Sequence, residues 1–281
     1  MRKPTWKKRI SLLLIYAFLL LMVVVSVYPV LWVIGASLSP GDSIFSTTLI
    51  PENATLDHYR WLFTSPESDY KTWYANTLKI SFLNAVLSVI LTTGTAYIFS
   101  RYRFYGRKYG LIAFLALQMF PASMTMVAIY LLLNLLNLLD SHWGLLLVYA
   151  GMQIPFNTWL VKGYFDTIPR SLDEAARIDG AGHWTTFWKV IMPLAKPIVA
   201  VVFLFNFMGP ATDFLLPQIV LTNPENQTLA VGLFNFINND FKKQYTLFAS
   251  GSVLVALPVT VVFLALQKYF ITGLTAGATK G

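Results

Sequence analysis

Polar and small residues between Ser171 and Gly180 form the stretch of this sequence whose residue types and spacing could do chemistry. Ser171 is followed three residues later by Glu174, with Pro169 just upstream. This spacing predicts a capping box, in which both side chains bond free backbone N–H groups at the start of a helix. Gly180 is predicted to end that helix after about two turns. Such a short helix is not stable alone, so the chemistry expected is recognition by the groove of a partner protein.

Two short helices are predicted in the segment 162–193. The first presents one apolar face, which consists of Leu172, Ala175 and Ala176. The second carries large apolar residues at the i, i+3, i+4, i+7 spacing of a single helix face, namely Trp184, Phe187, Trp188 and Ile191, and Pro193 is expected to end it. An ordinary amphipathic hairpin fits this spacing as well as a partner-binding helix does.

Motifs for nucleotide or metal chemistry do not occur in the sequence. There is no Gly-x-x-x-x-Gly-Lys-Ser/Thr loop, and residues 277–280 only resemble the end of one. His58, His142 and His183 are far apart, and no HExxH or carboxylate cluster suggests a metal site. Asp213 lies inside an apolar segment, where an acid is a functional candidate by default. Its place near the end of that segment also allows contact with water, so both readings stay open.

The elements that must position these residues are transmembrane helices. The chain has 281 residues, of which 56% are hydrophobic and only 12% are charged, against about 25% charged in soluble domains. Six segments reach the roughly 20 apolar residues needed to cross a membrane. They are 10–36, 78–100, 111–136, 143–161, 194–217 and 247–270. We therefore expect an all-α membrane protein with six transmembrane helices in a single transmembrane domain, residues 1–281.

Several features qualify these spans. The first apolar run is longer than the roughly 7–15 residues of a signal peptide core, which favours an uncleaved helix.

Pro121, Pro197, Pro210 and Pro258 fall inside the predicted spans and are expected to bend them. There is no cysteine, so disulfides and thiolate metal sites are excluded.

The distribution of positive charge predicts the orientation. Sixteen of the 21 Lys and Arg residues lie on the side that holds both termini, the 2–3 loop and the 4–5 loop. Cytoplasmic loops are enriched in these residues, so both termini are expected in the cytoplasm. The charges flank apolar spans, and nucleic-acid binding is therefore not expected. Two longer loops, 37–77 and 218–246, would face outward, and their aromatic residues could lie at the headgroup level or form a docking surface for an external protein.

Several motifs of this sequence resemble those of a known protein family. Glu174-Ala-Ala, followed by Asp179-Gly-Ala181 and by Val190-Ile-Met-Pro193, resembles the EAA loop of bacterial ABC importer permeases, although Val190 and Met192 depart from the usual ending. Segments 76–77, 96–106, 118–121 and 229–232 resemble the carbohydrate-uptake branch. The tail 273–281 is similar to that of the smaller permease subunit of maltose/maltodextrin importers.

The resemblance implies a type I ABC importer permease fold in which the loop 162–193 forms cytoplasmic coupling helices. The ATPase-coupling residues it implies are Ser171, Glu174, Ala175, Ala176, Asp179, Gly180 and Ala181. The outer loop that it implies for contact with a binding protein contains Asn235, Asn238, Asn239, Asp240, Phe241 and Tyr245. The tail 271–281 is implied to reach the ATPase through Gly277, Lys280 and Gly281.

The same resemblance implies a non-catalytic subunit of a bacterial cell membrane importer. Its implied partners are a second, MalF-like permease subunit, an ATPase dimer that uses ATP and Mg, an extracytoplasmic solute-binding protein, a sugar and membrane lipid; this chain itself would bind no cofactor. Maltose and maltodextrins are the expected substrates, and trehalose, sucrose or mixed oligosaccharides stay open. An ion-coupled secondary transporter would need intramembrane acids or broken helices in paired positions of an internal repeat, and the sequence has one such acid and no convincing repeat. A membrane scaffold or receptor is the remaining alternative.

Overall fold

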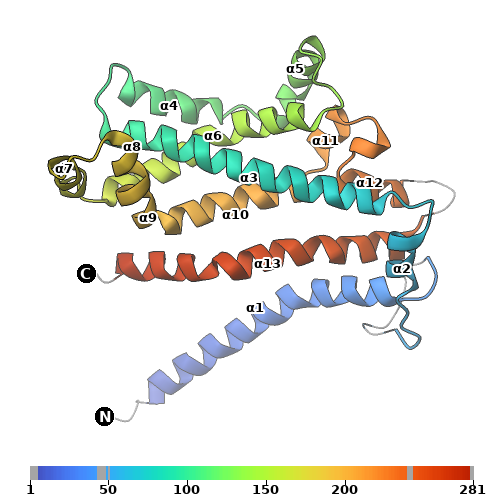
Figure 1. Ribbon diagram of the computed structural model, residues 1–281. Helices are drawn as coiled ribbons and strands as arrows, with labels where there is room; N and C mark the ends of the chain where they lie inside the picture. Colours follow the sequence, from blue (N-terminus) through green and yellow to red (C-terminus); the bar gives the residue numbers. More distant parts are fainter. Residues whose placement is uncertain (1–5, 43–48, 50, 239–242, 279–281) are drawn as a thin grey trace. The chain divides into compact units, whose positions relative to one another are not determined.

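The computed structural model describes residues 6–42, 49, 51–238 and 243–278, and in these residues all regular structure is helical (Figure 1). The helices are α1 (Trp6–Leu38), α2 (Asp57–Thr64), α3 (Tyr70–Arg101), α4 (Arg107–Leu117), α5 (Ala122–Leu135), α6 (His142–Thr167), α7 (Ser171–Ile178), α8 (His183–Thr185), the π-helix η1 (Thr186–Ile191), α9 (Met192–Leu194), α10 (Lys196–Thr212), α11 (Leu215–Val220), the 3₁₀-helix η2 (Pro224–Asn226), α12 (Leu229–Ile237) and α13 (Tyr245–Ala278).

The chain divides into two compact units. The first lies within residues 1–68 and 233–254, and the second within 69–232 and 255–281. In the first unit, α1 is exposed along most of its length and is buried only at Gly35–Ser37. Ser37 anchors this end, because its backbone carbonyl accepts the Ser250 hydroxyl at 3.0 Å and its Oγ lies 2.7 Å from the Tyr59 hydroxyl.

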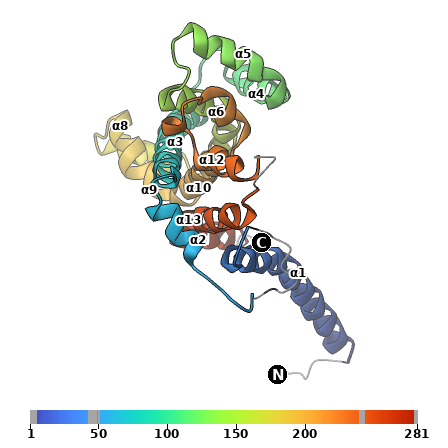
Figure 2. The ribbon, with the colours of Figure 1, turned by 90° about the vertical axis from the view of Figure 1, so that its right-hand side faces the viewer.

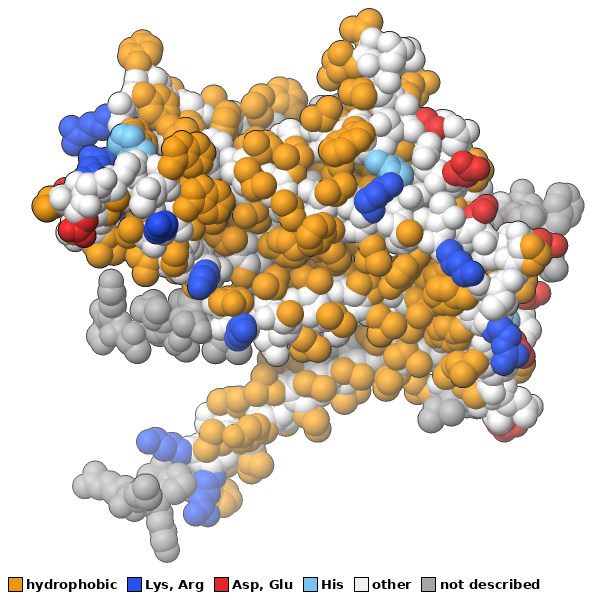
Figure 3. All heavy atoms as spheres, in the orientation of Figure 1, with side chains coloured by type: hydrophobic (Ala, Val, Ile, Leu, Met, Phe, Trp, Pro, Cys, Tyr) orange, Lys and Arg blue, Asp and Glu red, His pale blue; other side chains and the backbone are white. Residues whose placement is uncertain are grey.

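The second unit is built on three long helices. α3 packs along both α6 and α10 (Figures 1 and 2). Apolar residues fill the interface near the end of α3, where Val161, Phe165 and Val202 are buried. Figure 3 shows hydrophobic side chains over most of these helices, with charged side chains gathered toward their two ends. This distribution is typical of helices that cross an apolar layer.

Polar side chains also hold these three helices together. Asn84 of α3 donates from Nδ2 to Gln153 Oε1 of α6 at 3.1 Å and to the Asn206 carbonyl of α10 at 2.7 Å. Asn157 Nδ2 donates to Asn206 Oδ1 at 3.1 Å. Carboxamide contacts of this kind give membrane helices a specific register that apolar packing alone does not.

Four of the six expected spans coincide with helices that are long and apolar enough to cross a membrane: α1, α3, α6 and residues 245–269 of α13. The expected single helix 194–217 is wrong in its extent. α10 is 17 residues long, and the helical segment His183–Leu194 meets it at an angle of 82°. At its other end the chain becomes extended at Asp213 before α11 begins.

The expected span 111–136 is not a single helix. Among the described residues it is two helices, α4 and α5, separated by residues 118–121. Pro121 adopts an extended backbone conformation (φ −59°, ψ 128°) directly before α5. Proline has no N–H to donate and disfavours a helical conformation in the residue before it, so it ends one helix here and starts another rather than bending one.

A loop in the second unit is fastened by Asp140. Its Oδ1 accepts the backbone N–H groups of Thr222 and Asn223 at 2.9 and 3.0 Å, and its Oδ2 accepts the side-chain amides of Asn223 and Asn226. His142 Nε2 lies 2.8 Å from the Asn226 carbonyl. These contacts fix the segment after α11 to the start of α6.

Candidate functional site

The helix α7 occupies the segment that the sequence singles out, but it does not begin with a capping box. Arg170 is the N-cap residue and has a helical conformation (φ −66°, ψ −23°), and no side chain bonds the free N–H groups. Ser171 is therefore the first helical residue and its hydroxyl is not at the N-cap position. Asp173 and Glu174 lie in the first turn, where negative charge is favourable to the helix dipole.

The predicted end of α7 at Gly180 is confirmed. Gly180 has φ +80°, a left-handed conformation that favours glycine. The N–H of Ala181 donates to the Ala176 carbonyl at 2.9 Å and that of Gly180 to the Arg177 carbonyl at 3.0 Å. This pair of bonds is a Schellman motif, which satisfies the last carbonyls of a helix and turns the chain sharply away.

The buried face of α7 differs from the expected one. Asp173 and Ala176 are buried, whereas Leu172 and Ala175 are exposed, and Ile178 is 86% exposed. The apolar residues Leu172, Ala175 and Ile178 therefore form a surface that faces away from the rest of the chain. An exposed apolar stripe on a two-turn helix is typical of a helix that inserts into a groove of a partner.

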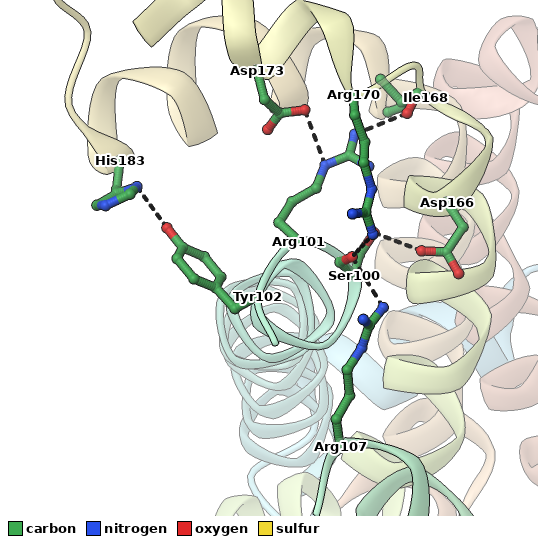
Figure 4. Close-up of polar contacts among 9 residues, drawn as sticks. All are labelled: Ser100, Arg101, Tyr102, Arg107, Asp166, Ile168, Arg170, Asp173 and His183. Carbon is green, nitrogen blue, oxygen red and sulfur yellow. Dashed lines mark hydrogen bonds and ion pairs between the residues drawn. The ribbon is translucent and has the colours of Figure 1, made fainter. Parts of the chain in front are cut away.

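The buried face is held by an ion pair. Arg101, the last residue of α3, places Nε 3.1 Å from Oδ2 of Asp173, and the two side chains are only 4% and 8% exposed (Figure 4). The Arg101 Nη2 also donates to the carbonyl of Ile168 at 3.0 Å. Charges this deeply buried are stabilised only by each other and by hydrogen bonds, so α7 is fixed in place against the end of α3.

Further polar contacts surround Ser100, next to the ion pair (Figure 4). Its carbonyl accepts from Nη2 of Arg107 and of Arg170, each at 3.2 Å. Its hydroxyl donates to Asp166 Oδ1 at 2.7 Å, and the Lys162 ammonium lies 2.6 Å from Asp166 Oδ2. The last carbonyls of α3, the end of α6 and the residue before α7 are thus bonded to one another.

The second short helix departs from its expected single face. Phe187 and Ile191 are buried, but Trp184 and Trp188 are exposed, because residues 186–191 form a π-helix. A π-helix bonds i→i+5 and has a wider turn than an α-helix, so the i, i+4 pairs Trp184–Trp188 and Phe187–Ile191 each stay together, while neighbours three residues apart separate onto two sides. The chain also continues helically through Pro193 to Leu194 rather than ending before it.

Three residues that matter here escaped the sequence analysis. The sequence indicates Arg101 only as an orienting charge and as part of the segment 96–106, and it does not single out Asp173 or Asp166. The available signal was a basic residue at the end of a span together with an acid beside Glu174. Their pairing depends on a chain reversal over about 70 residues, which spacing does not reveal.

The other predicted site residues are placed as follows. Asn235 lies in α12, Asn238 follows it and Tyr245 begins α13, while Asn239, Asp240 and Phe241 are outside the described residues. Gly277 is in α13, and Lys280 and Gly281 are outside the described residues. The coupling residues Glu174, Ala175, Asp179 and Gly180 are each exposed.

Known proteins resemble the chain along nearly its whole length. The family described as binding-protein-dependent transport system inner membrane component matches residues 88–275. The galactooligosaccharides transport system permease protein GanQ of Bacillus subtilis is 49% identical, over 98% of this chain and 98% of the relative. The maltodextrin transport system permease protein MdxG of the same organism is 47% identical, over 95% of each chain.

A solved structure has the same arrangement of helices. A chain of a bacterial ABC transporter involved in the import of the acidic polysaccharide alginate superposes with a TM-score of 0.82 and is 26% identical. The alignment covers 96% of this chain and 100% of that one.

Proposed function

The chain belongs to the family of inner membrane components of binding-protein-dependent transport systems, and from this premise we propose that it is a permease subunit of an ABC importer for oligosaccharides. Its relatives are transport system permease proteins, so the chain is a non-catalytic subunit of a bacterial inner membrane transporter, and a separate ATPase hydrolyses ATP. Six spans in one permease domain with both termini in the cytoplasm remain part of the proposal.

The mechanism is supported by how α7 is attached to the rest of the chain. Its outer surface is small, exposed and partly apolar, and its inner surface is tied to α3 by the buried pair Arg101–Asp173. A groove that closes around α7 would therefore displace the end of α3 with it. We propose that Glu174, Ala175, Asp179 and Gly180 contact the ATPase, with Ser171, Ala176 and Ala181 shaping the helix that does so.

The remaining partners are proposed from the family. A second permease subunit would complete the pathway, and an external solute-binding protein would deliver the sugar to the outer loop that includes Asn235, Asn238 and Tyr245. The tail from Gly277 onward would contact the ATPase dimer. ATP and Mg would be bound by that dimer, and this chain would bind no cofactor.

The substrate is proposed to be a maltodextrin. The relative MdxG, a maltodextrin transport system permease protein, is 47% identical. A galactooligosaccharide is the second candidate, because the relative GanQ is 49% identical over a slightly larger share of the chain. Maltodextrin is preferred because further relatives are maltodextrin or maltose permeases, such as MalD of Streptococcus pneumoniae at 40% identity.

Reconstitution tests this function. The chain is purified with its ATPase, partner permease and binding protein in lipid nanodiscs, and ATP hydrolysis is measured with each sugar. Stimulation by maltodextrin but not by galactooligosaccharide is expected. Stimulation by galactooligosaccharide alone would transfer the assignment to the second candidate. An ATPase that fails to co-purify with the chain, or that no binding protein stimulates, would overturn the proposal.

A further inference from the structure

A pocket lies between the end of α3 and the helices that follow α7. Its volume is about 550 Å³, which is in the range of sites for small ligands. Its apolar walls include Gly94, Tyr97 and Ile98 of α3 and Trp184 and Phe187 of the α8–η1 segment. All of its lining residues belong to the second unit.

The pocket is polar at one end and apolar at the other. Its polar end is formed by Tyr102, Arg103 and His183, and the Tyr102 hydroxyl lies 2.7 Å from His183 Nδ1 (Figure 4). Its apolar end reaches back to Gly94, which is about 12 Å along the helix from Tyr102 at 1.5 Å per residue. A ligand that fills it must therefore combine a polar head with an apolar body.

The polar end carries an available positive charge. Arg101 and Arg107 beside it are engaged with Asp173 and with backbone carbonyls. Arg103, by contrast, is exposed and has no ion pair or hydrogen bond within the part of the chain that the structure describes. An unpaired guanidinium favours an anionic head, and phosphate suits its geometry.

We propose that this pocket binds an anionic phospholipid of the inner leaflet, with its phosphate at Arg103 and an acyl chain extending toward Gly94. This inference rests on the proposed orientation, which places the end of α3 at the cytoplasmic membrane surface. Basic pockets on that side of membrane helices bind anionic headgroups, and exposed aromatics such as Trp184 are enriched at this depth.

The position of the lipid gives it a role in coupling. One wall of the pocket is α3 and the other is the segment that follows α7. The lipid therefore contacts both of the elements between which a movement of α7 would be transmitted. A bound acyl chain would fill the space between them and limit their relative movement. Anionic lipid should therefore raise the fraction of ATP hydrolysis that is linked to sugar transport.

Gly94 allows a direct test. A Cβ at Gly94 would meet no atom within 4 Å, so Gly94→Leu fills the pocket without a backbone clash. Gly163→Leu is the matched control, because Gly163 is also helical with open space around it and does not line the pocket. Arg103→Gln removes the charge at the polar end, and Lys108→Gln removes a nearby charge outside the pocket.

The assembled transporter is purified with each variant, and bound phosphatidylglycerol is counted by native mass spectrometry after washing in detergent. Arg103→Gln should reduce retention about fivefold, the effect of one basic residue at a membrane surface. Gly94→Leu should reduce it at least as much, and both controls should retain lipid as the unaltered chain does.

Nanodiscs with and without phosphatidylglycerol then measure transport per ATP. The unaltered chain should gain from phosphatidylglycerol, and Gly94→Leu should not. Equal retention by all variants, or equal retention of phosphatidylcholine, would overturn the lipid site. Loss of the partner subunit from Gly94→Leu complexes would show that a protein segment fills the pocket instead. Failure of the unaltered chain to bind an ATPase would reject the transport function independently of this site.

Discussion

At the residue scale, the position of α7 depends on one buried contact. Arg101 and Asp173 are charges of opposite sign with almost no access to water, and they join the end of a membrane helix to the short helix beyond it. The surrounding hydrogen bonds come from Arg170, Arg107 and Ser100 and go mainly to backbone carbonyls, so they can persist when the ion pair is broken.

Removing one partner of this pair should be strongly destabilising. Asp173→Asn leaves the Arg101 guanidinium buried without a counter-charge, and we expect the free energy of unfolding to fall by about 3–5 kcal/mol. The exposed pair Asp57–Arg60 supplies the control: Asp57→Asn should change stability by less than about 1 kcal/mol. Thermal unfolding of the purified chain in detergent measures both.

Exchanging the two charges tests whether the Arg101–Asp173 contact acts as an ion pair or only through the shape of its side chains. The double variant Arg101→Asp, Asp173→Arg should recover part of the stability that Asp173→Asn loses. It should not recover all of it, since the Arg101 bond to the Ile168 carbonyl is lost. A double variant that is less stable than Asp173→Asn would contradict this account of the contact.

Asp140, in the loop before α6, is expected to stabilise the fold by an amount that depends on pH. Burial would raise its pKa, but the hydrogen bonds from Asn223, Asn226 and Thr222 outweigh burial, so the pKa of Asp140 lies below its ordinary value. A carboxyl with a lowered folded-state pKa stabilises the fold fully above its unfolded pKa of about 4. That contribution is lost as the pH falls through the folded-state pKa.

Asp140→Asn should therefore lower the melting temperature at neutral pH, and the difference from the unaltered chain should shrink as the pH falls below about 4. An asparagine amide would face the side-chain amides of Asn223 and Asn226, which then lose their acceptor. Melting curves measured along a pH series test this expectation. A difference that is constant with pH would show that shape rather than charge matters at this position.

At the element scale, the glycine that ends α7 fixes the direction in which the chain leaves it. Gly180→Val forces a branched residue into φ +80°, which should unwind the last turn and weaken both ATPase binding and transport. Gly180→Asn should retain more of both, because asparagine tolerates this conformation. Gly182→Val is the control, since Gly182 has an ordinary extended backbone and open space. Equal loss in Gly180→Val and Gly182→Val would refute a role for the turn.

The elements that sequence analysis predicts best are those that depend on the residue types of their own segment rather than on contacts with other helices. Long apolar runs identify α1, α3, α6 and α13, and Gly180 marks the end of α7 through its own backbone freedom. The sequence predicts a bend at Pro121, because it shows that a backbone hydrogen bond is missing but not whether the helix resumes in the same direction. Ser171 fits a capping box by spacing, yet the chain arrives at Arg170 already helical. Both outcomes depend on tertiary packing.

The candidate site divides in the same way. Its exposed half, from Glu174 to Gly180, is continuous in sequence and could be identified there. Its buried half pairs Arg101 with Asp173 and Ser100 with Asp166, and these contacts exist only after α3 and α6 have packed together. The π-helix that separates Trp184 from Phe187 likewise has no simple sequence signal.

At the scale of the whole molecule, the orientation in the membrane can be measured directly. The chain has no cysteine, so a single introduced thiol is unambiguous. Glu225→Cys should react with a membrane-impermeant maleimide in intact spheroplasts, because it is exposed on the side that carries few positive charges. Tyr105→Cys, in the loop after α3, should react only after the membrane is opened. The reverse pattern would invert the proposed topology.

The first helix has a consequence for how this chain can change over evolutionary time. Between Trp6 and Trp32 its side chains are exposed, and its backbone bonds are made within the helix itself. Where lipid surrounds such a helix it accepts most apolar side chains equally well, and natural selection then has few reasons to preserve particular residues. Sequence drift should be fastest in this stretch, and whole first helices should be exchangeable between diverged lineages, while Gly35–Ser37, where packing begins, stay constant.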